Sequence, residues 1–345
     1  MPYFGNEPGE TTKSTVVGAY NYLINGEMRV ATRGLQMDTG FNDDDMYTLD
    51  QWILLSESND GVDVTQTTTV PSGGAVKSMG LDVEIANEMF GICQIIENKN
   101  CGGLIGNEVT LSFQAKVTDA RIGDVRAYIL AWDGTADSVT SDVVATWNDD
   151  ANPTFATNWT AENTGADLGV TTSFAKYSVT ANIDTSNATN VAVFIACVDD
   201  SVNAGDFLYI TDVQLENGDT ASDYVREDMA TTSQKCHRYL QRVLGGGNNY
   251  TYMLGMGNSS NQVFGGMRHM HGLMRVAPTG SVFSASTMQR RDGSGSNETS
   301  STQILLYSPS THDFSLIITA ATVTANTVYH IEWNGTGWIQ MSAEL

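Results

Sequence analysis

Positive charge, cysteine and proline are scarce in this chain, and long apolar runs are absent. Among its 345 residues are 17 lysines and arginines against 40 aspartates and glutamates, which gives a formal net charge of −23. A chain with this balance repels phosphate backbones and anionic lipid. No apolar run approaches the length of a membrane-spanning helix. We therefore expect no nucleic-acid partner and no membrane insertion.

The acidic excess has two interpretations. Net charge keeps a protein soluble and discourages non-specific contacts. Carboxylates also bind hard cations, and the acidic stretches Asp43-Asp44-Asp45 and Asn148-Asp149-Asp150 are the candidate loops. Both interpretations stay open from the sequence alone.

The four cysteines do not form a recognisable site. Cys93, Cys101, Cys197 and Cys236 show no CxxC motif and no paired spacing with histidines, so a zinc site is not expected. Apolar, strand-like residues surround Cys93 and Cys197 and predict buried free thiols. A disulfide between Cys93 and Cys101 across a loop remains an alternative.

Known catalytic motifs are also missing. The chain has no GxSxG, HExxH, phosphate-loop or dinucleotide-binding pattern. His269-Met-His271 is the one histidine cluster, and on a strand the two rings would face the same side and could share a metal. No third ligand is evident nearby, so packing or subunit contacts are the favoured interpretation. We expect the chain not to be an enzyme.

What the chain does contain is the pattern of a mainly β protein. Thr, Ser, Asn and 33 glycines supply strand and turn residues. Apolar and polar residues alternate along 109–117, and turn signals separate this segment from similar ones. This density of strands predicts a jelly-roll β-sandwich. Further candidate strands are 125–132, 177–181, 191–198, 207–215, 304–307, 314–320 and 328–333.

Four regions follow from these patterns. Residues 1–20 lack periodicity and predict an extended arm, and residues 21–226 contain the sandwich strands. Residues 227–247 predict a linking helix, because the apolar residues at 236, 239, 240 and 243 have helical spacing and Thr231 or Thr232 could cap it. Residues 248–345 return to β character and predict a smaller C-terminal β domain.

Several segments together resemble phage tail and fibre proteins. The opening Met1-Pro-Tyr-Phe-Gly-Asn-Glu-Pro8 resembles their short virion-anchoring start. The stretches 21–34, 47–52, 90–97 and 104–113 resemble the early and central strands of a carbohydrate-binding-module-like jelly roll. Ile210-Thr-Asp-Val-Gln-Leu-Glu-Asn-Gly218 and Ala221-Ser-Asp-Tyr-Val225 resemble its last strand and exit. The likeness covers 1–240 well and the remaining residues loosely.

This resemblance implies a structural fibre subunit of a bacteriophage virion, with a tail fibre as the first choice. It implies a homotrimer, anchored to other virion proteins through residues 1–20 and able to meet a glycan on the host surface. The protein would be made in the host cytoplasm, and the start of the chain carries no secretory signal pattern. A sugar-binding module of a polysaccharide-processing system stays open as the alternative. A depolymerase spike is disfavoured, because the sequence shows neither a β-helix repeat nor a clear carboxylate cleft.

The resemblance also implies candidate site residues. In calcium-binding jelly rolls, one carboxylate near the first strand and one near the last hold a structural calcium, and Glu27 and Asp212 are the matching positions. The alternative is that Asp212 makes turn hydrogen bonds and Glu27 is solvated.

Three tryptophans are the candidates for glycan binding. Trp132, Trp147 and Trp159 lie in or beside long polar loops, where an indole face could stack on a sugar ring. The favoured alternative is that these rings fill the interiors of the loops or contact neighbouring subunits. Trp52 is expected in the core.

Overall fold

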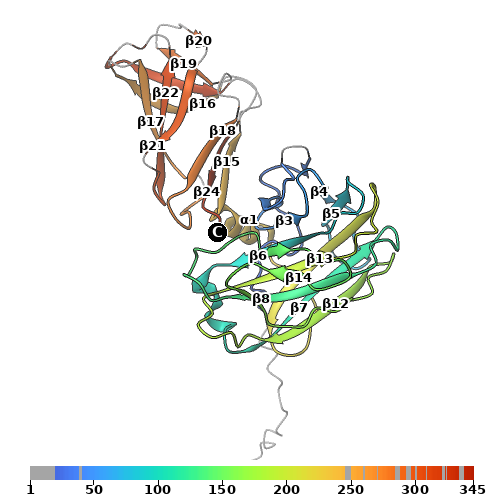
Figure 1. Ribbon diagram of the computed structural model, residues 1–345. Helices are drawn as coiled ribbons and strands as arrows, with labels where there is room; N and C mark the ends of the chain where they lie inside the picture. The colour runs from blue at the N-terminus through green and yellow to red at the C-terminus, as the bar shows by residue number, and fades with distance from the viewer. Residues whose placement is uncertain are drawn as a thin grey trace, which may run out of the picture. The chain divides into compact units, whose positions relative to one another are not determined.

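The computed structural model describes residues 20–38, 41–244, 250–258, 261–269, 271–283, 288–292, 297–299, 301–307, 309–320, 323, 325–333 and 338–345. The predicted virion-anchoring arm lies, except for Tyr20, outside the described residues. The fold is mainly β, as predicted, with a jelly-roll β-sandwich, one short α-helix and a smaller β-rich C-terminal region (Figure 1).

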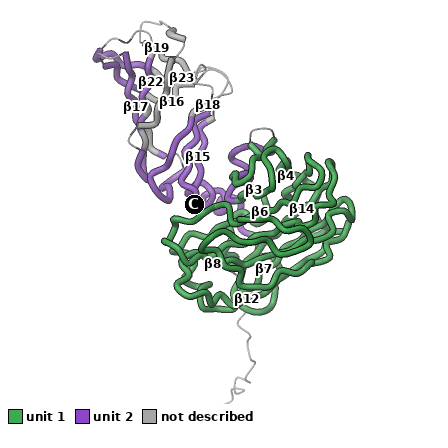
Figure 2. Tube along the Cα trace, viewed as in Figure 1, with its two compact units in different colours: residues 1–29, 36–46, 52–226 green, residues 30–35, 47–51, 227–345 purple. Residues whose placement is uncertain are grey.

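The described chain divides into two compact units (Figure 2). Unit 1 comprises 36–46, 52–226 and the residues before 30, and unit 2 comprises 30–35, 47–51 and 227–345. Two short segments that the sequence pattern placed in the jelly roll therefore belong to unit 2. Polar contacts hold them there, because Arg33 pairs with the buried carboxylate of Glu344 and the Tyr47 hydroxyl donates to the Leu345 carbonyl at 2.9 Å.

Two antiparallel six-stranded sheets form the sandwich of unit 1. The order in sheet A is β1 (Gln36–Met37), β4 (Val62–Thr67), β5 (Ser78–Val83), β14 (Phe207–Asn217), β7 (Glu108–Val117) and β12 (Ala175–Asn182). The order in sheet B is β11 (Trp159–Ala161), β8 (Val125–Trp132), β13 (Asn190–Cys197), β6 (Phe90–Ile96), β3 (Ile53–Ser56) and β2 (Met46–Tyr47).

The core of unit 1 follows from residue alternation. On β7 the side chains of Val109, Leu111 and Phe113 are fully buried, and this row continues to Val117. The intervening Thr110 and Ser112 face the other side of sheet A and form part of a polar layer. Strands β6 and β13 of sheet B are buried along their whole length.

The polar excursion between β8 and β12 supplies apolar cover for sheet B. It contains the short strands β9 (Val144–Thr146), β10 (Thr154–Phe155) and β11. Phe155 packs edge-on against Tyr128 of β8, with ring centroids 5.2 Å apart, and Trp147 lies 5.9 Å from the ring of Phe194 on β13. The 3-10 helix η1 (Asn98–Gly103) follows β6.

The helix prediction is correct only in its first half. Helix α1 spans Met229–His237, and the Asp228 side chain caps it by accepting from the Ala230 amide, in place of the predicted threonine cap. Residues 240–244 form strand β15 (Leu240–Leu244) instead of a continuing helix. Pairing with the distant strand β24 (Trp338–Ser342) overrides the local helical spacing.

Unit 2 contains two further antiparallel sheets. A three-stranded sheet has the order β15, β24 and β18 (Thr279–Phe283). A seven-stranded sheet has the order β20 (Asn297–Thr299), β19 (Met288–Asp292), β23 (Val328–Trp333), β16 (Tyr250–Gly257), β17 (Gln262–Arg268), β22 (Asp313–Ala320) and β21 (Ser301–Tyr307). None of the helices in the described part of the chain has the length and apolar character needed to cross a bilayer.

Candidate functional site

A β-bulge in the last strand of the sandwich organises the candidate site. The register between β14 and β7 shifts between Thr211 and Gln214, and Asp212 has a φ of 52°. The Val213 amide, released from the ladder, donates to the Gly26 carbonyl at 2.9 Å. A Cβ at Gly26 would lie 2.1 Å from the Val213 oxygen, so only glycine permits this close approach.

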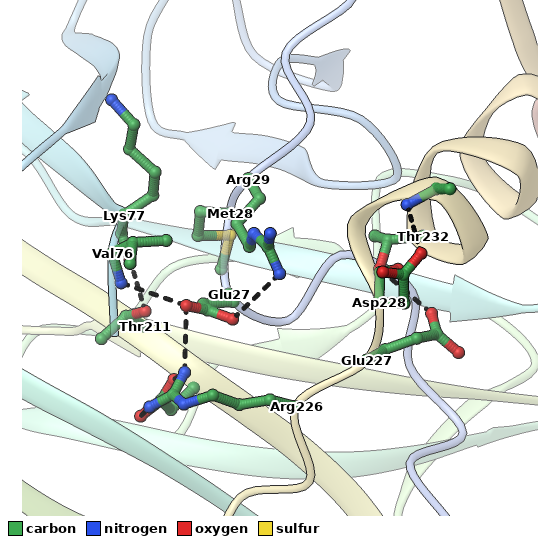
Figure 3. A network of polar contacts seen from close by, with 12 residues as sticks. Glu27, Met28, Arg29, Val76, Lys77, Thr211, Arg226, Glu227, Asp228 and Thr232 are labelled. Carbon is green, nitrogen blue, oxygen red and sulfur yellow. Dashed lines mark hydrogen bonds and ion pairs between the residues drawn. The ribbon is translucent and has the colours of Figure 1, made fainter. Parts of the chain in front are cut away.

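The bulge brings together the two carboxylates that the resemblance singled out. Glu27 and Asp212 are only 4% and 3% exposed, and the guanidinium of Arg226 contacts both. Figure 3 shows its ion pair with Glu27. Arg226 Nη1 lies 3.0 Å from Glu27 Oε1 and 3.1 Å from Asp212 Oδ1, and Nη2 donates to Asp212 Oδ2 at 3.2 Å. Gln114 donates to the same Asp212 oxygen at 2.8 Å, and the Val76 amide donates to Glu27 at 3.0 Å.

The positive charge between these carboxylates is therefore that of Arg226. Burial alone lowers the pKa of Arg226, but its hydrogen bonds to Asp212 and the attraction of Asp212 and Glu27 outweigh burial and raise it. A guanidinium in this position satisfies the charges that a calcium ion would otherwise balance. Calcium at Glu27 and Asp212 stays a prediction, and Arg226 is the group with which it would compete.

A polar pocket of about 370 Å³ opens beside this ion-pair network. Its floor comes from β7 and β14 of sheet A, and its walls come from β12 and from the segment that follows β14. The residues lining it include hydroxyl, amide, carboxylate and cationic groups together with one phenol ring: Gly73, Ser112, Phe113, Gln114, Lys176, Asp212, Asp223, Tyr224 and Arg226.

Hydrogen bonds fix the wall formed by the segment after β14. The Ser222 amide donates to Glu216 Oε1 at 2.8 Å, and its hydroxyl donates to Oε2 at 2.7 Å. The Val225 amide donates to Gln214 Oε1 at 2.9 Å. Lys176 donates to the carbonyls of Ala221 and Ser222 and forms no ion pair within the described part of unit 1. The pocket thus has a preformed wall and one cation without a bound carboxylate.

The structure separates the three predicted tryptophans. Trp132 and Trp159 are buried, and their ring centroids lie 5.2 Å apart. Their indole N–H groups donate to the carbonyls of Thr135 at 3.1 Å and Thr140 at 2.8 Å. A sugar ring stacks only on an exposed face, so these two rings fill the loop interior, which corrects the prediction for them. Trp147 is half-buried and remains a candidate.

The predicted acidic loops differ in their surroundings. Asp149 of one loop lies with Asp199 and Asp200, and one oxygen from each falls within 4.8 Å of the others, so this trio could hold a metal. In the other loop, Asp44 accepts from the Ser56 amide at 2.9 Å and Asp45 accepts from the Ser141 hydroxyl at 3.1 Å. Exposed acidic groups are common without an ion, so the trio alone does not establish a site.

The thiols and histidines show no nucleophilic arrangement in the described residues. All four cysteines are free and buried, which confirms the prediction for Cys93 and Cys197 and leaves no disulfide between Cys93 and Cys101. Burial raises the pKa of the Cys101 and Cys197 thiols to about 12. His269 and His271 follow the end of β17 and do not act as a pair. The His269 ring nitrogen Nε2 lies 2.9 Å from the Ser310 carbonyl, while His271 stacks on His237 at 3.9 Å.

Comparison with known proteins gives only distant likenesses. No family model and no curated protein matches this chain. The enzymatically active domain of bacteriophage CBA120 tailspike protein 4 is 17% identical, with a TM-score of 0.36 over 57% of this chain and 21% of that chain. A putative sugar binding protein from Bacteroides thetaiotaomicron is 15% identical, with a TM-score of 0.36 over 58% of this chain and 100% of that chain.

A xylan-binding domain from CBM 22 is a further match. It is 14% identical, with a TM-score of 0.32 over 54% of this chain and 98% of that chain. Likenesses at these values carry no argument about function. The two antiparallel six-stranded sheets of unit 1 define the jelly roll independently of these likenesses.

Sequence reasoning did not identify most of the pocket. Lys176, Gln114 and Arg226 come from three segments that only the sheet pairing and the bulge bring together. Tyr224 lies in the stretch that resembles the exit of the jelly roll, but no local pattern marks its ring as a pocket wall. A search for polar residues on the outward-facing positions of β7 and β12 would have found Gln114 and Lys176.

Proposed function

We propose that this chain is a non-catalytic, sugar-binding structural subunit of a bacteriophage fibre. The observation that carries the proposal is the polar pocket on sheet A. Hydroxyl groups of sugars are recognised by carboxylates, amides and ammonium groups, and an aromatic ring packs against the apolar face of a pyranose. The pocket on sheet A supplies these partners through Lys176, Gln114, Asp223 and Tyr224.

The charges of the pocket favour a neutral glycan. Lys176 and Arg226 balance Asp212 and Asp223 among the lining residues. Unit 2 holds equal numbers of acidic and basic residues, so the whole formal charge of −23 lies in unit 1. An acidic polysaccharide would meet this field on approach, whereas a neutral one would not.

A non-catalytic role is consistent with the state of the reactive groups. Both oxygens of Asp212, the buried carboxylate of the pocket, are engaged by Arg226, and Gln114 binds one of them as well. A carboxylate held in this way is poorly placed to donate a proton to a leaving group. The raised thiol pKa values disfavour a cysteine nucleophile.

Binding to a panel of neutral and acidic bacterial polysaccharides tests the sugar proposal. We expect the wild-type chain to bind a neutral glycan with little dependence on salt. Tyr224→Ala should weaken binding about fivefold, because stacking contributes roughly 1 kcal/mol. Lys99→Ala, which removes an exposed lysine on η1, is the matched control for Lys176→Ala. Equal binding by Lys176→Ala, Tyr224→Ala and wild type would refute the pocket assignment.

The resemblance to fibre proteins supports three further proposals. The chain forms a homotrimer, it attaches to other virion proteins through residues 1–20, and it is located in the virion. Electron microscopy of phage particles labelled with an antibody against this chain tests them together. Label on fibres supports the proposal, and label absent from purified particles contradicts it. Structural calcium at Glu27 and Asp212 is a further proposal, and there it would compete with the guanidinium of Arg226.

A further inference from the structure

One face of the seven-stranded sheet in unit 2 presents an exposed apolar row. Register places Phe264 of β17 opposite Met256 of β16, and Met256 opposite Val328 of β23. Leu254 lies two residues before Met256 and therefore on the same face. Leu254, Met256 and Val328 are 58%, 55% and 49% exposed, so the row spans three adjacent strands and faces solvent.

The opposite face of the same sheet is part of the core of unit 2. Val263 and Tyr329, which alternate with the row on their own strands, are buried, and so is Ile318 of β22. A two-faced sheet that buries one side normally carries polar residues on the other. Here neighbouring outer positions of β16, β17 and β23 carry the apolar side chains of the row instead, which is typical of a surface that another protein covers.

The distribution of charge indicates which protein covers this surface. The formal charge of −23 is confined to unit 1, and the acidic and basic residues of unit 2 balance. Two copies of the chain therefore repel each other through unit 1 but not through unit 2. The four side chains of the row are uncharged, so copies can approach face to face there without bringing like charges together.

We propose that copies of this chain associate through the apolar row formed by Leu254, Met256, Phe264 and Val328. The row deepens the fibre proposal by naming the contact surface, and in that respect it rests on the proposed function. It does not depend on the sugar pocket, which lies on different strands in unit 1. Two pleated faces of this kind pack as sheets do in a sandwich, with alternate side chains interdigitating.

Sedimentation and light scattering on the full chain test the proposal. The wild type should have a mass that is a multiple of 37.2 kDa. Met256→Lys and Val328→Glu should each weaken association by about tenfold or more, because a buried unpaired charge opposes contact. One variant adds a positive charge and the other a negative charge. If both weaken association, the cause is burial of a charge in the contact and not attraction or repulsion between copies. Ile85→Lys is the matched control, because Ile85 is 44% exposed in unit 1.

Salt provides an independent readout. Raising NaCl from about 50 to about 500 mM should strengthen association of the wild type, because it screens the repulsion between copies of unit 1. Leu254→Ser removes apolar surface without adding charge and serves as the second variant if a charged variant misfolds by circular dichroism.

Three outcomes would overturn the inference. These are a wild type that is monomeric at all concentrations, variants with the wild-type association constant, and Ile85→Lys weakening association as much as Met256→Lys. A monomeric wild type that binds neutral lipid vesicles through Met256 would assign the row to a membrane surface instead. Glycan binding is measured separately, so loss of assembly with intact sugar binding refutes only this inference.

Discussion

Replacing Arg226 by glutamine removes the positive charge between two buried carboxylates. Breaking a buried ion pair by removing one partner destabilises a protein by about 3–5 kcal/mol. The effect is smaller here because the Arg226 side chain is 35% exposed, Arg29 remains 3.8 Å from Glu27, and Gln114 still binds Asp212. We expect the free energy of unfolding of unit 1 to fall by about 2–3 kcal/mol. This corresponds to a loss of roughly 4–12 °C in Tm for a unit of this size.

Differential scanning calorimetry measures this change. Arg226→Lys should give an intermediate Tm, because an ammonium keeps the charge but loses the two-nitrogen geometry. Lys99→Gln, which breaks the pair between the exposed Lys99 and the buried Glu97 carboxylate, should lower the free energy of unfolding by at most about 1 kcal/mol. An Arg226→Gln chain with the wild-type Tm would refute the reasoning that the guanidinium neutralises these carboxylates.

The same samples separate Arg226 from calcium. If the guanidinium is the cation of this site, EDTA leaves the Tm of the wild type unchanged, and millimolar calcium raises the Tm of Arg226→Gln, in which the carboxylates are unpaired. The calcium prediction for Glu27 and Asp212 gives the opposite result for the wild type. There EDTA lowers the Tm, because the ligand binds only the native state.

Three further changes have defined outcomes. Gly26→Ala should destabilise unit 1 strongly in a melting experiment, because its Cβ would meet the Val213 carbonyl at 2.1 Å; an unchanged Tm would contradict the close packing at the bulge. Trp159→Ala should lower the free energy of unfolding by about 3–5 kcal/mol and leave glycan binding unchanged at temperatures below its Tm; loss of binding with intact folding would restore this ring as a sugar contact. Burial and the neighbouring Glu84 and Asp63 raise the pKa of Asp82 to about 6, so the folded state binds its proton more tightly than the unfolded state does. The contribution of Asp82 to stability should therefore rise as pH falls from 7 towards 4. Asp82→Asn should raise the free energy of unfolding at pH 7 by on the order of 1 kcal/mol after solvent screening, and with it the Tm, and should flatten this part of the Tm–pH curve. A Tm–pH curve like that of the wild type would contradict the assignment.

The sandwich was predictable because its strands carry their signal locally. The alternation from Val109 to Val117 corresponds to β7, and the segment 125–132 coincides with β8. The helix prediction for 240–244 was wrong because the apolar spacing of this segment fits a helix. Its strand partner β24 lies about a hundred residues further along the chain. Local periodicity contains no information about such distant pairing.

The candidate site was predictable only in part. Glu27 and Asp212 do lie together, as the resemblance implied, but no pattern indicated that Arg226 would stand between them. Their meeting depends on a bulge and on the approach of Gly26 to Val213, and both are tertiary features. Trp132 and Trp159 look like surface rings in a polar sequence, yet they pack on each other because even a polar loop needs an apolar interior.

Nuclear magnetic resonance titration of the chain with a neutral polysaccharide that it binds tests the central claim most directly. We predict that the signals which shift belong to the pocket, namely the backbone amides around Ser112 and Gln114 and those of 223–226, while the indole signal of Trp147 stays in place. Shifts centred on Trp147, with the pocket signals unchanged, would contradict the assignment of sugar binding to sheet A.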